Sequence, residues 1–313
     1  MLVKLFHNAV AGNESQPDAD RLQLLIRAAG HEVVYYPYPH PYPASPEADW
    51  PAILNRPCDL VVIAGGDGTA GRIAKQLVGC NVPMTFIPLG TANNISRSFG
   101  LAGLSLEQLI AGWSRARVQK LDIGVITSPW GSRYFIEGVG MGLFARTMIG
   151  IDSADALAHL ESSEEKIMHA LRLMSRRLEE LPAGRLNLTL DGRDLSGEYI
   201  MLEVMNICFV GPNLFIAPGS DPADGLLDIV LVSEGQRRDL QKYLTSWRQG
   251  TLCAPELTTY KGKHLQIEWY GGSLHVDDEA WPPMDASLPS GPALIDVSVR
   301  MHALEIWLPD GSA

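Results

Sequence analysis

The stretch Leu60-Val61-Val62-Ile63-Ala64-Gly65-Gly66-Asp67-Gly68-Thr69 decides the fold, because a glycine-rich turn follows directly on an apolar run. Five consecutive apolar residues are typical of a parallel strand buried on both faces. The segment from Ala70 to Val78 predicts a helix after the turn. Glycines let the backbone approach a phosphate closely, and a helix N-terminus offers oriented N–H groups and partial positive charge. We therefore predict a phosphate-binding turn, rather than an ordinary strand-to-helix connection, formed by Gly65, Gly66, Asp67, Gly68 and Thr69.

A second turn of the same kind follows the next predicted strand, which runs from Met84 to Pro88. The sequence Leu89-Gly90-Thr91-Ala92-Asn93-Asn94 leads there into a short helical segment. Taken alone, this turn would indicate only a helix cap. Because neighbouring parallel strands end at the same edge of a sheet, we expect both turns to surround one ligand. The candidate ligand-binding residues of the second turn are Gly90, Thr91 and Asn93.

Strand and helix patterns alternate through the first 121 residues, with apolar strand-like runs at 2–6 and 32–36 and helical patterns at 18–29 and 104–113. This alternation predicts an α/β domain whose parallel sheet lies between two layers of helices. From residue 122 to 295, alternating apolar residues and glycine turns indicate a β-rich, sandwich-like second domain. One helix is expected in it, near 155–181.

Composition excludes several classes of protein. Apolar residues make up 46% of the 313 residues and charged residues 19%, as in a globular protein. The net charge of −11 argues against a nucleic-acid partner, since phosphate affinity requires clustered Lys and Arg. The four widely spaced cysteines favour reduced thiols in the cytoplasm. They are Cys58, Cys80, Cys208 and Cys253.

Two familiar nucleotide motifs are missing from the sequence. No GxxxxGK[ST] loop occurs, and Gly138-Val139-Gly140-Met141-Gly142 lacks the GxGxxG spacing of a dinucleotide fold. The most apolar window, from Tyr199 to Pro218, is interrupted by Glu203 and Asn206, so it predicts buried strands rather than a membrane span.

At its two glycine turns the chain resembles the diacylglycerol kinase catalytic-domain family, which includes soluble bacterial lipid kinases and sphingosine kinases. Four further segments match that family's motifs in the same order, the third of them closely. They are His7-Asn8-Ala9-Val10-Ala11-Gly12, Leu121-Asp122-Ile123-Gly124, Asp221-Pro222-Ala223-Asp224-Gly225-Leu226-Leu227-Asp228 and Val276-Asp277-Asp278-Glu279.

The resemblance implies a role for each segment. ATP phosphates would lie on Asn8 and the two glycine turns, with Mg²⁺ bridging them near Asp67 and Asp122. A second role for Mg²⁺ is implied at Asp224, assisted by the carbonyls of Asp221 and Leu226, although this motif would also form a plain type I turn.

The last of the matching segments is implied to supply the general base. Asp277 and Glu279 are the candidates to accept the proton of the acceptor hydroxyl. Two residues apart on an extended segment, they are expected to point the same way. His275, beside them, is interpreted as a strand residue. The final strand is implied to return to the first domain, which would then include 296–313.

The chain departs from the family pattern at four places. Asn94 stands where the family has Asp, and Gly71 and Arg72 replace an Asn-Glu pair. Asp278 replaces the glycine of the Asp-Gly-Glu turn. A nucleotide-contacting Thr has no counterpart in the Tyr-Pro-rich stretch at 35–46.

Three functions follow as hypotheses. The first is an ATP-dependent kinase of diacylglycerol or a related lipid alcohol, acting from the cytoplasm at a membrane surface. The second is a kinase of a soluble alcohol or nucleotide, similar to NAD kinase, and the third is a non-catalytic nucleotide-binding protein. Membrane docking would use a basic cluster, and a homodimer is left open. The cluster consists of Arg172, Arg176, Arg177 and Arg185.

Overall fold

The computed structural model describes residues 1–12, 16–38, 53–54, 56–151, 160, 162–251, 254–283, 286–287 and 289–309. The chain divides into two units, Met1–Leu121 with His302–Ala313 and Asp122–Met301. The first unit thus resumes at His302 and not at residue 296, because the last strand is long and its first half pairs within the second unit. Most of the Tyr-Pro-rich stretch, residues 39–46, lies outside the described residues, as does Cys253.

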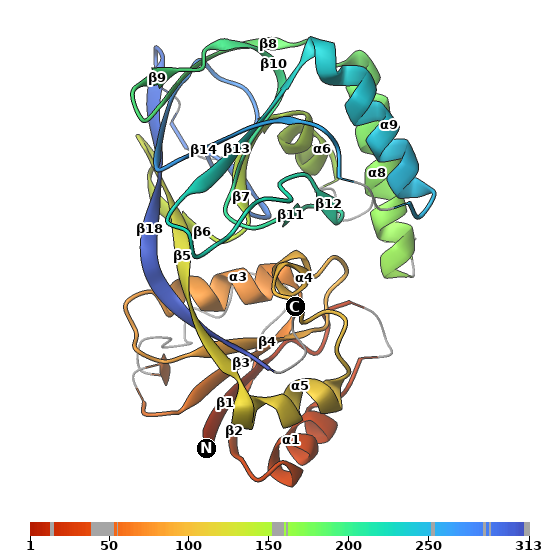
Figure 1. Cartoon of the computed structure of the whole chain (residues 1–313), viewed down its shortest axis with the longest axis vertical. Helices are drawn as coiled ribbons and strands as arrows, with labels where there is room; N and C mark the ends of the chain where they lie inside the picture. Colours follow the sequence, from red (N-terminus) through yellow and green to blue (C-terminus); the bar gives the residue numbers. More distant parts are fainter. Residues whose placement is uncertain are drawn as a thin grey trace. The chain divides into compact units, whose positions relative to one another are not determined.

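The first unit is built on a parallel sheet in the order β2-β1-β3-β4-β18 (Figure 1). Continuous burial of β3 agrees with its unbroken apolar sequence. The strands are β1 (Leu2–His7), β2 (Glu32–Pro37), β3 (Leu60–Gly65), β4 (Met84–Pro88) and the end of β18 (Ala293–Leu308).

Helices cover both faces of this sheet, so the predicted three-layer α/β arrangement is confirmed. Figure 1 shows α3 and α4 on one face and α1 and α5 on the other. Leu22 and Ile26 of α1 and Ile110 of α5 pack against the apolar side chains of β1 and β3. The helices are α1 (Ala19–Ala28), α3 (Asp67–Gln76), α4 (Asn94–Ser98) and α5 (Leu106–Gly112), followed by the 3₁₀ turn Trp113–Arg115.

The second unit is a sandwich of antiparallel strands with β10 at its centre, paired with β7, β8 and β13. Its main core joins apolar residues from these strands and from β15, β16 and β18. The β-rich prediction is therefore confirmed. The strands are β5 (Arg117–Ser128), β6 (Gly131–Phe135), β7 (Gly138–Gly142), β8 (Gly184–Leu190), β9 (Arg193–Asp194), β10 (Gly197–Met205), β11 (Phe209–Val210), β12 (Leu214–Phe215), β13 (Leu227–Ser233), β14 (Thr258–Gly262), β15 (His264–Trp269), β16 (Leu274–Val276) and β17 (Glu279–Trp281).

The expectation of a single helix in this unit was wrong, because its described part also contains α6 (Leu143–Ile151) and α9 (Arg237–Arg248) beside α8 (Ser163–Glu180). The three helices share a second apolar core with the outer face of β10 and β13. Leu171, Met174 and Leu178 of α8 are buried in it, which explains the apolar stripe of that helix by packing. None of the described helices is long and apolar enough to cross a membrane.

Candidate active site

The glycine turn after β3 and the turn after β4 touch through their backbones. A Cβ atom added to Gly90 would lie 2.3 Å from the Cα of Gly66, and one added to Gly66 would lie 2.9 Å from the Cα of Gly90. Both distances are shorter than real side chains allow, so glycine is required at both positions. Leu89 also donates its N–H to the carbonyl of Gly65 at 2.9 Å. The two turns therefore form one surface at the carboxyl edge of the sheet.

Polar side chains hold this paired turn in shape. Asn93 adopts a left-handed backbone with φ of 56°. Its Oδ1 accepts from the N–H of Gly90 at 2.8 Å, and its Nδ2 donates to the carbonyl of Gly90 at 2.9 Å. Asp67, the first residue of α3, accepts at Oδ1 from the N–H of Ile95 at 3.0 Å. Gly68 and Thr91 lie half-buried on the same two turns.

A third turn, after β1, joins the other two. The buried Asn8 donates from Nδ2 to Oγ1 of Thr69 at 2.8 Å. Gly12 has φ of 72°, and a Cβ atom there would lie 2.3 Å from the carbonyl oxygen of Leu89. The structure thus brings together every residue of the first unit that the sequence singled out for phosphate binding. Asn94, where the family has Asp, is buried at the start of α4.

A cavity of about 290 Å³ opens beside the same strand end, on the face of the sheet covered by α1 and α5. Its walls combine apolar side chains with polar groups, among them an exposed ion pair between Arg21 and Glu107. The residues that line it are Pro17, Arg21, Ile87, Pro88, Leu89, Leu104, Leu106, Glu107 and Leu109.

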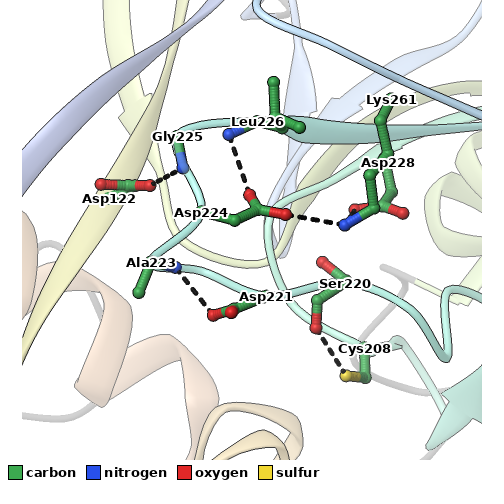
Figure 2. A network of polar contacts seen from close by, with 10 residues as sticks. All are labelled: Asp122, Cys208, Ser220, Asp221, Ala223, Asp224, Gly225, Leu226, Asp228 and Lys261. Carbon is green, nitrogen blue, oxygen red and sulfur yellow. Dashed lines mark hydrogen bonds and ion pairs between the residues drawn. The ribbon is translucent and has the colours of Figure 1, made fainter.

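In the second unit, Asp122 holds the acidic loop Asp221–Asp228 rather than standing apart from it (Figure 2). Its Oδ2 accepts from the N–H of Gly225 at 2.7 Å, and its own N–H donates to the carbonyl of Pro222 at 2.7 Å. Only 2% of Asp122 is exposed, so its carboxylate anchors the backbone of the loop from the buried side.

Within that loop, the carboxylate of Asp224 forms an ion pair with the ammonium group of Lys261. Its Oδ1 accepts from the N–H of Leu226 at 2.9 Å, and its Oδ2 lies 2.7 Å from Nζ of Lys261. The same ammonium lies 3.6 Å from Oδ2 of the buried Asp228. Burial raises the pKa of Asp228 above its usual value, and the positive charge of Lys261 opposes that rise.

This arrangement does not fit the Mg²⁺ ion expected at Asp224. A cation such as Mg²⁺ requires close oxygen ligands, whereas an ammonium group here contacts the carboxylate that would be its main ligand. The carbonyl of Asp221, another expected ligand, accepts from the N–H of Asp224 at 3.2 Å. Over the described part of the chain, no three His, Cys, Asp or Glu side chains are grouped so as to hold a metal.

Asp277 and Glu279 do not lie on one extended segment, so that expectation was wrong. Asp277 and Asp278 form the turn that connects β16 to β17, in which Val276 pairs with Glu279. Asp277 has a left-handed backbone with φ of 51°, whereas Asp278 has no positive φ. Asp278, which stands where the family has glycine, is therefore not strained by a left-handed backbone.

The carboxylate of Asp277 is held by backbone amides of the segment between β6 and β7. Its Oδ1 accepts from the N–H groups of Ile136, Glu137 and Gly138 at 3.1, 2.8 and 3.3 Å. Its Oδ2 accepts from the N–H of Ile136 at 3.2 Å. These bonds hold the carboxylate in one orientation.

Glu279 has a different partner. Its Oε2 is paired with Nη1 of Arg133, and both side chains are partly exposed. The guanidinium carbon of Arg133 lies 4.3 Å from the ring centre of Trp281, so the arginine is stacked as well as paired. The two candidate bases thus differ in their surroundings, one held by amides and the other by a cation.

Sequence reasoning missed a buried acid–base pair next to this turn. Nε2 of His275 lies 2.8 Å from Oε2 of Glu203, and Nδ1 of His275 lies 2.9 Å from the carbonyl of Asp277. Neither Glu203 nor His275 is exposed at all. Gly140 lies between them in the sheet, where a Cβ atom would be 2.1 Å from Oε2 of Glu203.

Asn206 was missed as well, although it and Glu203 were visible as interruptions of an apolar window. Its Nδ2 donates to the carbonyls of Asp122 and Ile136, at 3.2 and 3.1 Å. Asn206 therefore ties the strand that begins the second unit to the segment that holds Asp277. The signal was present in the sequence, but the partners could not be read from it.

Two protein-family models match parts of this chain. Residues 3–126 match the family model described as diacylglycerol kinase catalytic domain. Residues 148–299 match the one described as YegS C-terminal NAD kinase beta sandwich-like domain. The chain therefore combines a diacylglycerol kinase catalytic domain with a YegS C-terminal NAD kinase beta sandwich-like domain. It is therefore an ATP-dependent phosphotransferase.

Curated relatives within this family carry kinase names. The chain is 26% identical over 261 residues to "Diacylglycerol kinase" of Mycobacterium tuberculosis (strain CDC 1551 / Oshkosh), a match that covers 80% of each chain. It is 27% identical over 260 residues to "Probable lipid kinase YegS-like" of Pseudomonas fluorescens, which covers 80% of this chain and 78% of that one.

Solved structures share the fold. The crystal structure of a diacylglycerol kinase from Bacillus anthracis str. Sterne superposes with a TM-score of 0.66 at 18% identity. The superposition covers 99% of this chain and 98% of the other. At that identity the likeness concerns the fold alone.

Proposed function

We propose that the chain transfers the γ-phosphoryl group of ATP to a hydroxyl of diacylglycerol or of a related lipid alcohol. The observation that supports it most is the meeting of three strand-end turns in a unit that matches the diacylglycerol kinase model. The names of the relatives support a lipid acceptor. The alternative is a kinase of a soluble alcohol, which would bind ATP on the same turns.

In this proposal the triphosphate binds on Asn8, on Gly65–Thr69 and on Gly90–Asn93, at the N-terminus of α3. The N–H groups of that helix end, together with its dipole, favour the negative phosphates. The cavity beside Leu89 is large enough to take part of the nucleotide. The close approach of Gly66 and Gly90 leaves no side chain between backbone and phosphate.

ATP would enter with Mg²⁺, whose chemistry when bound is to neutralise the charge that develops on the transferred phosphoryl group. Asp67 fits this ion because its carboxylate stands half-buried at the first residue of α3, among the phosphate-binding residues. Asp122 fits it less well, since only 2% of that residue is exposed.

Asp277 or Glu279 would accept the proton of the attacking hydroxyl, a step that contributes roughly 10²–10⁴ in rate. Asp277 is favoured, because four backbone hydrogen bonds fix the position of its carboxylate. Docking on a membrane would use the basic cluster of Arg172, Arg176, Arg177 and Arg185. Three of these arginines are exposed, and Arg177 donates to the carbonyl of Arg146.

The test is transfer of radioactive phosphate from ATP to a panel of micellar lipids and soluble alcohols by the purified chain. We expect lipid phosphorylation, and a fall of roughly 10²–10⁴ in Asp277→Asn. Asp239→Asn, an exposed carboxylate on α9, is the matched control and should keep full activity.

Each other outcome favours a rival. Transfer to a soluble alcohol and to none of the lipids would replace the lipid acceptor. Binding of ATP without transfer to any acceptor would favour the non-catalytic protein. Loss of activity in Glu279→Gln but not in Asp277→Asn would move the base to Glu279.

A further inference from the structure

We propose that the ammonium group of Lys261 takes the place of a divalent cation in the acidic loop Asp221–Asp228, so that this loop is held by a cation belonging to the chain. The proposal concerns the second unit alone and does not depend on which acceptor is phosphorylated. It accounts for the mismatch between the expected Mg²⁺ ligands and the contacts that the structure shows.

The first support is the position of Lys261 in the sheet. Lys261 on β14 stands directly opposite Asp228 on β13 in the antiparallel register. Opposite charges that face each other across two strands stabilise the pairing. The sheet itself therefore directs the lysine toward the loop that ends at β13, and its place does not depend on a flexible surface segment.

The second support is the number of carboxylates that one ammonium serves. Nζ lies 2.7 Å from Asp224 and 3.6 Å from Asp228 (Figure 2). Asp228 is 2% exposed, and a buried carboxylate needs a partner charge. A small divalent cation bound between these carboxylates would also neutralise their charge. It would be repelled by the ammonium group of Lys261 at the same place.

The third support is the way the loop is closed without a metal. Asp221 and Asp224 each accept from a backbone N–H two residues ahead, at 3.0 and 2.9 Å. Gly225 donates to Asp122 at 2.7 Å. With the backbone held by these bonds, the charges of Asp224 and of the buried Asp228 remain to be balanced, and the ammonium group of Lys261 lies beside both.

The experiment measures metal binding and thermal stability without nucleotide or lipid. The full chain is stripped with EDTA, and then Mg²⁺ is added in Tm measurements and Mn²⁺ in electron paramagnetic resonance titrations. The Tm of the unsubstituted chain should change by less than about 1 °C. Mn²⁺ binding should be the same in the unsubstituted chain and in Asp224→Asn, because we expect no ion at Asp224.

Lys261→Met removes the charge and keeps the length of the side chain. Its Tm in EDTA should fall, and Mg²⁺ at about five times its dissociation constant should raise it by about 2–4 °C. Adding Asp224→Asn should remove that gain. Lys242→Met is the matched control, because Lys242 forms an exposed ion pair with Asp239 on α9; its Tm should not respond to Mg²⁺.

Two results would overturn the proposal. One is a Mn²⁺ ion bound by the unsubstituted chain and lost in Asp224→Asn. The other is a Lys261→Met variant whose Tm equals that of the unsubstituted chain and ignores Mg²⁺. If Lys261→Met does not fold, the Mn²⁺ titration of the unsubstituted chain and of Asp224→Asn still decides. Since no readout uses ATP or a lipid, a failure here is distinguishable from a failure of the kinase assay.

Discussion

The glycine turns of the first unit and the acidic turns of the second unit were both marked by short motifs, but different forces hold them. Around Gly66 and Gly90 the shape comes from backbone contact and from the side chains of Asn93 and Asp67, which bind backbone groups of the turns themselves. In the second unit the marked carboxylates are bound to partners: Asp224 to Lys261, Asp277 to three amides, and Glu279 to Arg133. The partners of the glycine turns are therefore mainly backbone groups close to them in the fold, whereas the role of each carboxylate in the second unit depends on its own partner.

The largest expected effect comes from the buried pair behind the Asp277 turn. Glu203→Gln would leave His275 inside the core without its negative partner, and breaking a buried pair costs about 3–5 kcal/mol. Urea unfolding measures the loss. Glu198→Gln, an exposed change on the same strand, is the control and should leave the free energy of unfolding within about 0.5 kcal/mol.

The same pair predicts a pH dependence. Burial opposes the charge of His275, but the Glu203 carboxylate outweighs it and holds the pKa of His275 above its usual value of 6.5. A raised folded-state pKa contributes stability that is complete below the unfolded pKa and is lost as pH rises through the folded pKa. The gap in unfolding free energy between the unsubstituted chain and Glu203→Gln should therefore shrink from pH 6 to pH 9. A gap that widens over that range would contradict the charged pair.

This pair also marks the limit of sequence reasoning. The glycine turns were predicted because a strand followed by glycines restricts the backbone whatever surrounds it. Glu203 and Asn206 were visible in an apolar window, but their partners depend on the register of β7, β10 and β16. Lys261 lies 37 residues from Asp224 and Arg133 lies 146 from Glu279, so no local spacing reveals either pair.

A medium effect is expected where the two glycine turns touch. In Gly90→Ala the new methyl group would meet the Cα of Gly66, a backbone atom that cannot rotate away. Overpacking of this kind typically costs about 1–3 kcal/mol. The methyl group would push the two turns apart and so displace the groups proposed to bind the phosphates. The affinity for ATP should therefore fall by more than about tenfold, which corresponds to 1.4 kcal/mol.

Calorimetric titration with ATP and thermal unfolding test this together. The matched control is Gly103→Ala, since a Cβ atom at Gly103 has nothing within 4 Å and its backbone has no positive φ. That variant should bind ATP as the unsubstituted chain does. Unchanged ATP affinity in Gly90→Ala would show that the nucleotide does not lie on these turns.

The smallest effect on stability is expected at the partly exposed pair, and it separates the two candidate bases. Arg133→Met removes the cation beside Glu279 and leaves the amides around Asp277 in place. A partly exposed ion pair contributes about 0–1 kcal/mol, and salt screens it. The loss measured by urea unfolding should therefore lie below about 1 kcal/mol and shrink further in 1 M salt. If Asp277 is the base, phosphoryl transfer by Arg133→Met should stay within about threefold of the unsubstituted rate, less than the roughly 10²–10⁴ that a general base contributes. A larger change, with stability preserved, would assign the proton to Glu279 and show that an acidic turn in this unit works through its ion pair and not through its amide-bound carboxylate.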